Sequence, residues 1–190
     1  KFLLISLIVI LLNGCSSSNM KDFENKTPKL NLFEFFKGET VAYGIFEDRF
    51  GKLRRQFRVK IKGSVEENTL TLDEKFIYDD GEKATRIWKI KKINENNNLI
   101  KYEGSAEDVE GLATGTSVGN ALNWTYDIYL NIKGSNLKVK FNDWIYKQDS
   151  NVAINRAYVS KFGIDIGSVT LVFLRGQTAK TVSPLNMNSW

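Results

Sequence analysis

The chain has 190 residues, with 27 basic and 22 acidic side chains and a formal charge of +5 at neutral pH. It contains no histidine and a single cysteine, which excludes catalytic triads that need an imidazole and the usual zinc, copper and haem ligand sets. Hydrophobic residues make up 42% of the sequence, so we expect a folded core, and no block of basic residues indicates a nucleic-acid partner. We therefore expect no metal, no cofactor and no nucleic acid.

The beginning of the chain has the pattern of a bacterial lipoprotein signal peptide. In residues 2–12 every side chain but one is apolar, and this run is shorter than the roughly 20 residues that a membrane-spanning helix needs. Leu12-Asn13-Gly14-Cys15 follows directly and is typical of a lipobox. We expect residues 1–14 to be removed and Cys15 to be lipidated. The alternative is an ordinary signal peptide followed by an incidental cysteine.

The segment after Cys15 predicts a location. Ser16 stands where an aspartate would favour the inner membrane, so we expect an outer-membrane anchor with the protein facing the periplasm. The polar residues 15–29 are predicted to be a flexible tether. A short amphipathic helix is predicted over 30–36, directly before the first strand.

Residues 39–175 alternate between apolar and polar side chains and are interrupted by turn signals every 8–14 residues. This pattern predicts an all-β domain over 30–175, an antiparallel up-and-down barrel of lipocalin or calycin type whose helix closes one end. Residues 176–190 form an extension of open role, and we expect a monomer. The ten predicted strands are 41–48, 53–62, 70–78, 85–93, 99–106, 112–118, 122–133, 137–146, 152–160 and 164–175.

Two hairpins allow the register to be predicted. A two-residue turn at Asp149-Ser150 would place Asp143 opposite Arg156, on the apolar face of both strands. A three-residue loop at 80–82 would make Glu74 and Arg86 diagonal neighbours, also on the apolar face.

These inward charges and the aromatic residues near them form the candidate site. One interpretation is that they are buried ion pairs and plain core; the other is that they line a cavity in which an arginine binds the carboxylate or phosphate of a lipid-like ligand. The candidate ligand-binding residues are Glu74, Arg86, Trp88, Trp124, Tyr126, Phe141, Asp143, Arg156 and Tyr158.

Several short motifs together identify a resemblance. They include Phe35-Phe36-x-Gly38, Leu72-Asp73-Glu74, Arg86-x-Trp88, Trp124-x-Tyr126, Asp143-Trp144-x-Tyr146 and Asn155-Arg156-Ala157. With the lipobox, they make the chain resemble a proteobacterial lipoprotein family of unknown function, domain of unknown function 3833. Members are similar to proteins encoded beside fatty-acid-modifying genes, which implies a link to envelope lipids and no defined activity.

Three functions remain open. The first is a periplasm-facing barrel that binds or carries a lipid-like molecule. The second is a metal-free lipid-modifying enzyme, an isomerase or hydratase, that uses Glu74 or Asp143 as its acid–base group. The third is a structural or assembly lipoprotein with a filled core. The sequence leaves the choice among them open.

Overall fold

The structure is a computed structural model and describes residues 18–96, 98–132, 135–182 and 184–190. The expected signal peptide and Cys15 lie outside the described residues. Among the described residues, no helix is both long enough and apolar enough to cross a bilayer.

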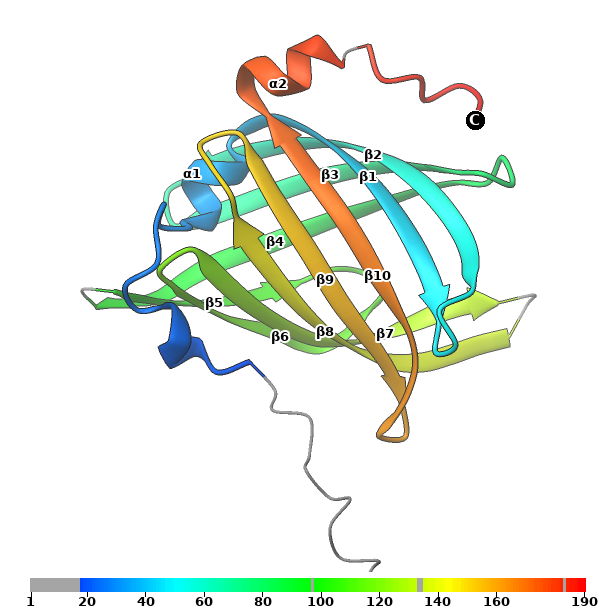
Figure 1. Ribbon diagram of the computed structural model, residues 1–190, viewed down its shortest axis with the longest axis horizontal. Helices are drawn as coiled ribbons and strands as arrows, with labels where there is room; N and C mark the ends of the chain where they lie inside the picture. Colours follow the sequence, from blue (N-terminus) through cyan, green and yellow to red (C-terminus); the bar gives the residue numbers. More distant parts are fainter. Residues whose placement is uncertain (1–17, 97, 133–134, 183) are drawn as a thin grey trace, which may run out of the picture.

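Ten long strands and three short helices make up the described chain (Figure 1). The helices are the 3₁₀ helix η2 (Met20–Phe23), α1 (Leu32–Phe36) and α2 (Gly176–Thr181). The strands are β1 (Gly38–Asp48), β2 (Leu53–Glu66), β3 (Thr69–Tyr78), β4 (Lys83–Asn96), β5 (Leu99–Ser105), β6 (Val109–Val118), β7 (Ala121–Ile132), β8 (Ser135–Lys147), β9 (Val152–Lys161) and β10 (Ile164–Arg175).

The strands close into one antiparallel barrel. Each strand pairs with its neighbours in the sequence, and β10 pairs with β1 to complete the ring, with Ala42 opposite Phe173. The prediction of an up-and-down barrel of about ten strands is therefore confirmed. Closure removes the unpaired edges that an open sheet of this size would expose.

Helix α1 covers one end of the barrel, which we call the α1 end. The side chain of Asn31 accepts hydrogen bonds from the Phe33 and Glu34 amides, at 3.0 and 3.4 Å, and so caps the helix. Phe35 and Phe36 are buried, and Phe36 packs edge-on against Phe173 with ring centroids 5.2 Å apart. The opposite end, which we call the far end, carries the turns at 49–52, 79–82, 106–108 and 162–163.

The segments outside the barrel also contact it. Phe23 of η2 packs against Trp144 and Tyr146 on the outer face, at centroid distances of 5.9 and 5.7 Å. The part of the expected tether that forms η2 therefore lies against β6, β7 and β8. At the other terminus, α2 contacts β1 and β10 and buries Ala179.

The β8–β9 register differs by one residue from the prediction. Asp143 lies opposite Ala157, and Arg156 lies opposite Trp144. The turn is longer than two residues because the Asp149 carboxylate accepts hydrogen bonds from the Asn151 and Val152 amides, at 2.7 and 2.8 Å. A shift of one residue turns a side chain to the other face of the sheet, so the prediction that Asp143 faces Arg156 is wrong.

The β3–β4 register differs from the prediction by two residues. Glu74 and Arg86 lie directly opposite each other, rather than on a diagonal. Because a shift of two preserves the face, both residues point into the barrel as predicted.

Candidate functional site

An aromatic wall crosses the interior of the barrel from β4 to β8. Trp88 contacts Trp124 and Tyr126 edge-on, at centroid distances of 5.7 and 5.2 Å, and Tyr126 stacks on Phe141 at 5.3 Å. The structure therefore brings together four of the residues predicted for the site. Contiguous aromatic faces of this kind suit an apolar ligand.

Two glycines make room for this wall. A Cβ added at Gly115 would overlap the Trp124 ring, and one at Gly104 would lie 2.8 Å from the same ring. The small residues of β5 and β6 therefore let Trp124 lie flat against the sheet.

Solvent reaches the interior in the half of the barrel near the far end. The inward side chains near α1 are buried, as Leu70 and Leu122 show. Several inward side chains nearer the far end remain half-buried: Phe46, Glu74, Phe76, Tyr78, Arg86, Tyr126, Phe141 and Val169. The interior is thus closed at the α1 end and partly accessible from the opposite side, where Ile128, Val139 and Val159 nevertheless form a buried cluster.

A cluster of charged groups lies in this accessible half. The Arg86 guanidinium donates to the Asp108 carboxylate, with Nε 3.0 Å and Nη2 2.7 Å from Oδ2. Glu74 lies opposite Arg86 but has no ion pair within 4.0 Å among the described residues. Burial raises the pKa of Glu74 to about 7. The positive charge of Arg86 lowers this pKa, and the negative charges of Asp108 and Asp143 raise it. Near neutral pH this carboxyl group exchanges a proton readily.

A second polar group lies deeper, between β8 and β9. Asp143 is 8% exposed and accepts a hydrogen bond from Asn155 Nδ2 at 2.7 Å. Its other oxygen, Oδ2, and the amide oxygen of Asn155 are buried with no hydrogen-bond partner within 3.5 Å among the described residues, although the Tyr126 hydroxyl lies close enough to Asp143 to lower its pKa. Burial raises the pKa of Asp143 to about 6, with Asn155, Tyr126 and Arg86 acting in the opposite direction.

The interior is rich in hydrogen-bond acceptors and poor in free cations. Among the described residues it holds the carboxyl groups of Glu74, Asp108 and Asp143 and the guanidinium of Arg86, which Asp108 already engages. Within the described residues, no group of three or more acidic or thiol side chains is arranged to hold a metal ion. The arrangement can therefore bind a molecule that donates hydrogen bonds, and Glu74 can exchange protons with it.

Two residues predicted for the site lie outside the barrel. Arg156 donates to Thr170 Oγ1 at 2.6 Å and lies 3.5 Å from Glu47 Oε2. Tyr158 also points outward and is 46% exposed. Their predicted place in the interior is wrong, because the β9 register turns both side chains away from it.

Sequence reasoning missed Asp108 and Asn155. Asp108 lies in the 106–108 turn, far from Arg86 in sequence, so no local pattern links the two. Asn155 alternates with Ala153 and Ala157, which are fully buried. That alternation of small residues was the available signal for the inward face of β9.

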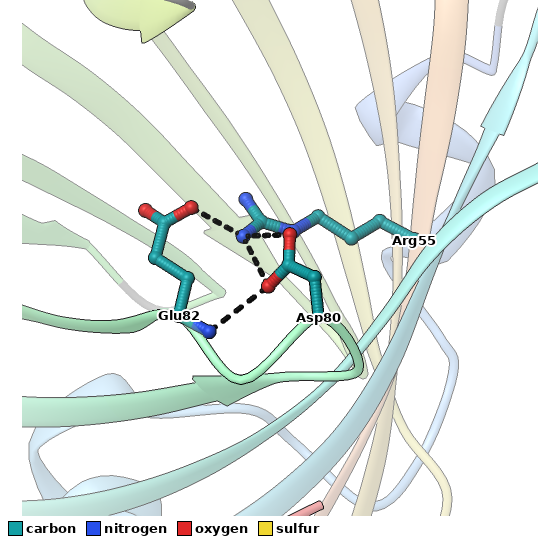
Figure 2. Close-up of polar contacts among 3 residues, drawn as sticks. All are labelled: Arg55, Asp80 and Glu82. Carbon is teal, nitrogen blue, oxygen red and sulfur yellow. Dashed lines mark hydrogen bonds and ion pairs between the residues drawn. The ribbon is translucent and has the colours of Figure 1, made fainter.

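Arg55 closes a second network at the far end (Figure 2). Its Nη2 donates to Asp80 at 2.9 Å and to Glu82 at 2.5 Å, and its guanidinium lies 3.5 Å above the centre of the Tyr78 ring. The contacts tie the β3–β4 turn to β2. Arg55 therefore positions the rim next to the accessible half of the interior.

Comparison with known proteins finds a matching family and a solved structure with a similar fold. A family model described as "Protein of unknown function (DUF3833)" matches residues 9–175. No curated protein matches. Among solved structures, the chain is similar to the S-type phycobiliprotein lyase CPES from Guillardia theta, with a TM-score of 0.58 and 8% identity, over 84% of this chain and 98% of that one. At this identity the likeness shows the fold alone.

Proposed function

The chain belongs to the DUF3833 family of proteins of unknown function, and we propose that its barrel binds a lipid-like molecule. The apolar part of the ligand lies against the wall of Trp88, Trp124, Tyr126 and Phe141. The observation that carries the proposal is the pair of buried acceptors without partners, one of them on Asp143. Such an acceptor costs on the order of 1–3 kcal/mol when it stays unpaired, and a donor on the ligand relieves that cost.

The charges favour a hydroxyl or amine on the ligand over a carboxylate. Arg86 was the expected partner for an anionic head group, but its guanidinium is already occupied by Asp108. A carboxylate placed beside Asp143 and Glu74 would meet like charges. A hydroxyl or an ammonium group would instead donate to Asp143 Oδ2.

A fluorescence titration tests this proposal. Trp88 and Trp124 report on the interior, so the protein is titrated with an alcohol, an amine and a carboxylate of one alkyl chain length. We expect the alcohol and the amine to bind more tightly than the carboxylate, and Asp143→Asn to weaken amine binding about tenfold. Asp127→Asn is the matched control, because Asp127 lies on the outer face near Lys138. If none of the three compounds binds, a structural lipoprotein without a ligand is the better account.

The proposal includes a membrane anchor. The lipobox ending at Cys15 supports lipidation of that thiol, and Ser16 supports retention at the periplasmic face of the outer membrane. The mass of the protein extracted from membranes tests this. An adduct of diacylglyceryl size on wild-type protein that disappears in Cys15→Ser supports the anchor, and an unmodified Cys15 refutes it.

The raised pKa of Glu74 favours a second candidate, an acid–base enzyme acting on lipids. A group with a pKa of about 7 is suited to both donate and accept protons at neutral pH. Turnover of unsaturated fatty-acyl substrates that Glu74→Gln abolishes, while ligand binding persists, would support it. Binding without turnover of any such substrate would favour the carrier.

A further inference from the structure

Two neighbouring turns at the far end repeat one sequence pattern. Arg49-Phe50-Gly51 joins β1 to β2, and Lys161-Phe162-Gly163 joins β9 to β10. Because β1 pairs with β10, the turns are adjacent in space (Figure 1). The Arg49 amide donates to the Ile166 carbonyl at 3.0 Å. Both turns have a glycine with positive φ, 76° at Gly51 and 78° at Gly163.

The phenylalanines at these tips are almost fully exposed. Phe162 is 92% exposed and Phe50 is 80% exposed, the two highest values among the exposed large hydrophobic residues of the described chain. Ile164 and Leu53 beside them are also exposed. Grouped apolar side chains of this kind mark an interaction surface more often than isolated ones do.

The backbone of Phe162 gives independent support. Its φ is +52°, a value that glycine and asparagine adopt readily and that a bulky side chain rarely adopts. The ring gains little packing in return, since it lies almost wholly in solvent. A strained residue without a structural role in the isolated molecule points to a role in binding.

The charges around the tips indicate the kind of partner. The Arg49 guanidinium carbon lies 4.8 Å from the centre of the Phe50 ring, and the Lys161 Nζ lies 5.2 Å from the centre of the Phe162 ring. Neither cation, nor Lys52 nearby, forms an ion pair with a described residue. Of the acidic neighbours, Asp48 and Glu47 are engaged, by Arg54 at 2.6 Å and by Arg156 at 3.5 Å, and Asp165 is exposed without an ion pair among the described residues, so the three cations outnumber the one free carboxylate.

We propose that the two turns insert Phe50 and Phe162 into the surface of a bilayer that contains anionic lipid. Aromatic rings reach the acyl boundary while flanking cations meet the phosphate groups, as in other interfacial segments. The β9–β10 turn lies at the bottom of the view in Figure 1, away from α1. The inserted turns lie at the end from which the barrel interior is accessible.

A lipid-borne quencher tests this contact without relying on any ligand. The full chain carries Cys15→Ser, which removes the one native thiol, and Ile164→Cys, which is labelled with an environment-sensitive fluorophore. It is mixed with vesicles of phosphatidylethanolamine and phosphatidylglycerol that contain a spin-labelled lipid. We expect quenching of about twofold or more. A label at Ser150→Cys, in a turn at the α1 end, is the positional control and should stay bright.

Further variants and a second lipid composition test the roles of the two phenylalanines and of anionic lipid separately. Phe50→Ser combined with Phe162→Ser should abolish quenching at position 164, whereas Ile93→Ser, which alters an exposed residue at the α1 end, should leave it unchanged. Equal quenching at 150 and 164, or quenching that survives loss of both phenylalanines, overturns the proposal. Equal quenching in phosphatidylcholine vesicles overturns the assignment to anionic lipid. None of these results depends on whether the interior binds a ligand.

Discussion

Glu74 and Arg86 lie directly opposite each other on β3 and β4, yet the Arg86 guanidinium binds Asp108 instead. The glutamate therefore has no ion pair within 4.0 Å among the described residues. Its pKa of about 7 follows from that arrangement, since burial disfavours the charged form and the charge of Asp108 adds to the effect. Asp108, in the β5–β6 turn, thus adds to the rise that burial causes in the pKa of Glu74 on β3.

Replacing Asp108 should lower the pKa of Glu74. In Asp108→Asn the negative charge is lost and the guanidinium becomes free to approach Glu74, so we expect a fall of about one unit or more. Carboxyl carbon shifts followed by NMR against pH measure it. Asp127→Asn, outside the barrel, is the control and should leave the titration unchanged. A pKa of Glu74 that stays near 7 in Asp108→Asn would show that burial alone sets it.

The two raised pKa values predict how stability depends on pH. Glu74 and Asp143 bind protons more tightly in the folded protein, with pKa values of about 7 and about 6, than in an unfolded chain. The folded state therefore holds more protons, and the free energy of unfolding falls as the pH rises from about 4 to about 7. A pKa difference of one unit between the folded and unfolded states corresponds to about 1.4 kcal/mol. Because solvent reaches Glu74, we expect a total loss of about 1–3 kcal/mol.

Urea denaturation at a series of pH values measures this loss. The double variant Glu74→Gln and Asp143→Asn should flatten the curve between pH 4 and 7, because both groups then stay neutral. A double variant that keeps the full slope would place the titrating groups elsewhere.

The fit of Trp124 against Gly115 predicts a large effect of one methyl group. In Gly115→Ala the new Cβ would overlap the indole, so either the ring or strand β6 must move. We expect the free energy of unfolding to fall by about 1–3 kcal/mol, as for other overpacked cores. Intrinsic fluorescence should shift at the same time. Thr114→Ala, on the exposed face of the same strand, should change both quantities little, and equal effects of the two variants would contradict the close fit.

The alternation of side chains was sufficient to predict ten strands, their order and the inward direction of the aromatic wall. The alternation of apolar and polar side chains is a local property of each strand, so it can be recognised without knowing the lengths of the turns. Registers are different because they depend on turn length. The Asp149 carboxylate bonds two backbone amides and lengthens the β8–β9 turn, and that contact moved Arg156 and Tyr158 to the outer face.

The β9 strand shows why apolarity alone misleads. Ile154 and Tyr158 are larger than Ala153 and Ala157, yet the alanines face the interior. Ala153 lies opposite Phe173, so the large ring on β10 leaves space for only a small residue beside it. The space for an inward side chain depends on the side chain opposite it on the neighbouring strand, so the sequence of one strand alone does not show which of its faces is inward.

The positive φ of Phe162 predicts that asparagine would stabilise that turn. Asparagine tolerates this conformation, and a phenylalanine there costs about 1–2 kcal/mol, so Phe162→Asn should raise the free energy of unfolding by about 0.5–1 kcal/mol. Phe50→Asn is the matched control: Phe50 is also exposed, but its φ is not positive. Urea denaturation of both variants separates backbone strain from loss of an exposed ring. A gain confined to Phe162→Asn, together with loss of vesicle contact in that variant, means that the turn gives up stability for binding. An equal change in both variants means that strain at Phe162 is negligible and removes that support for a bilayer contact.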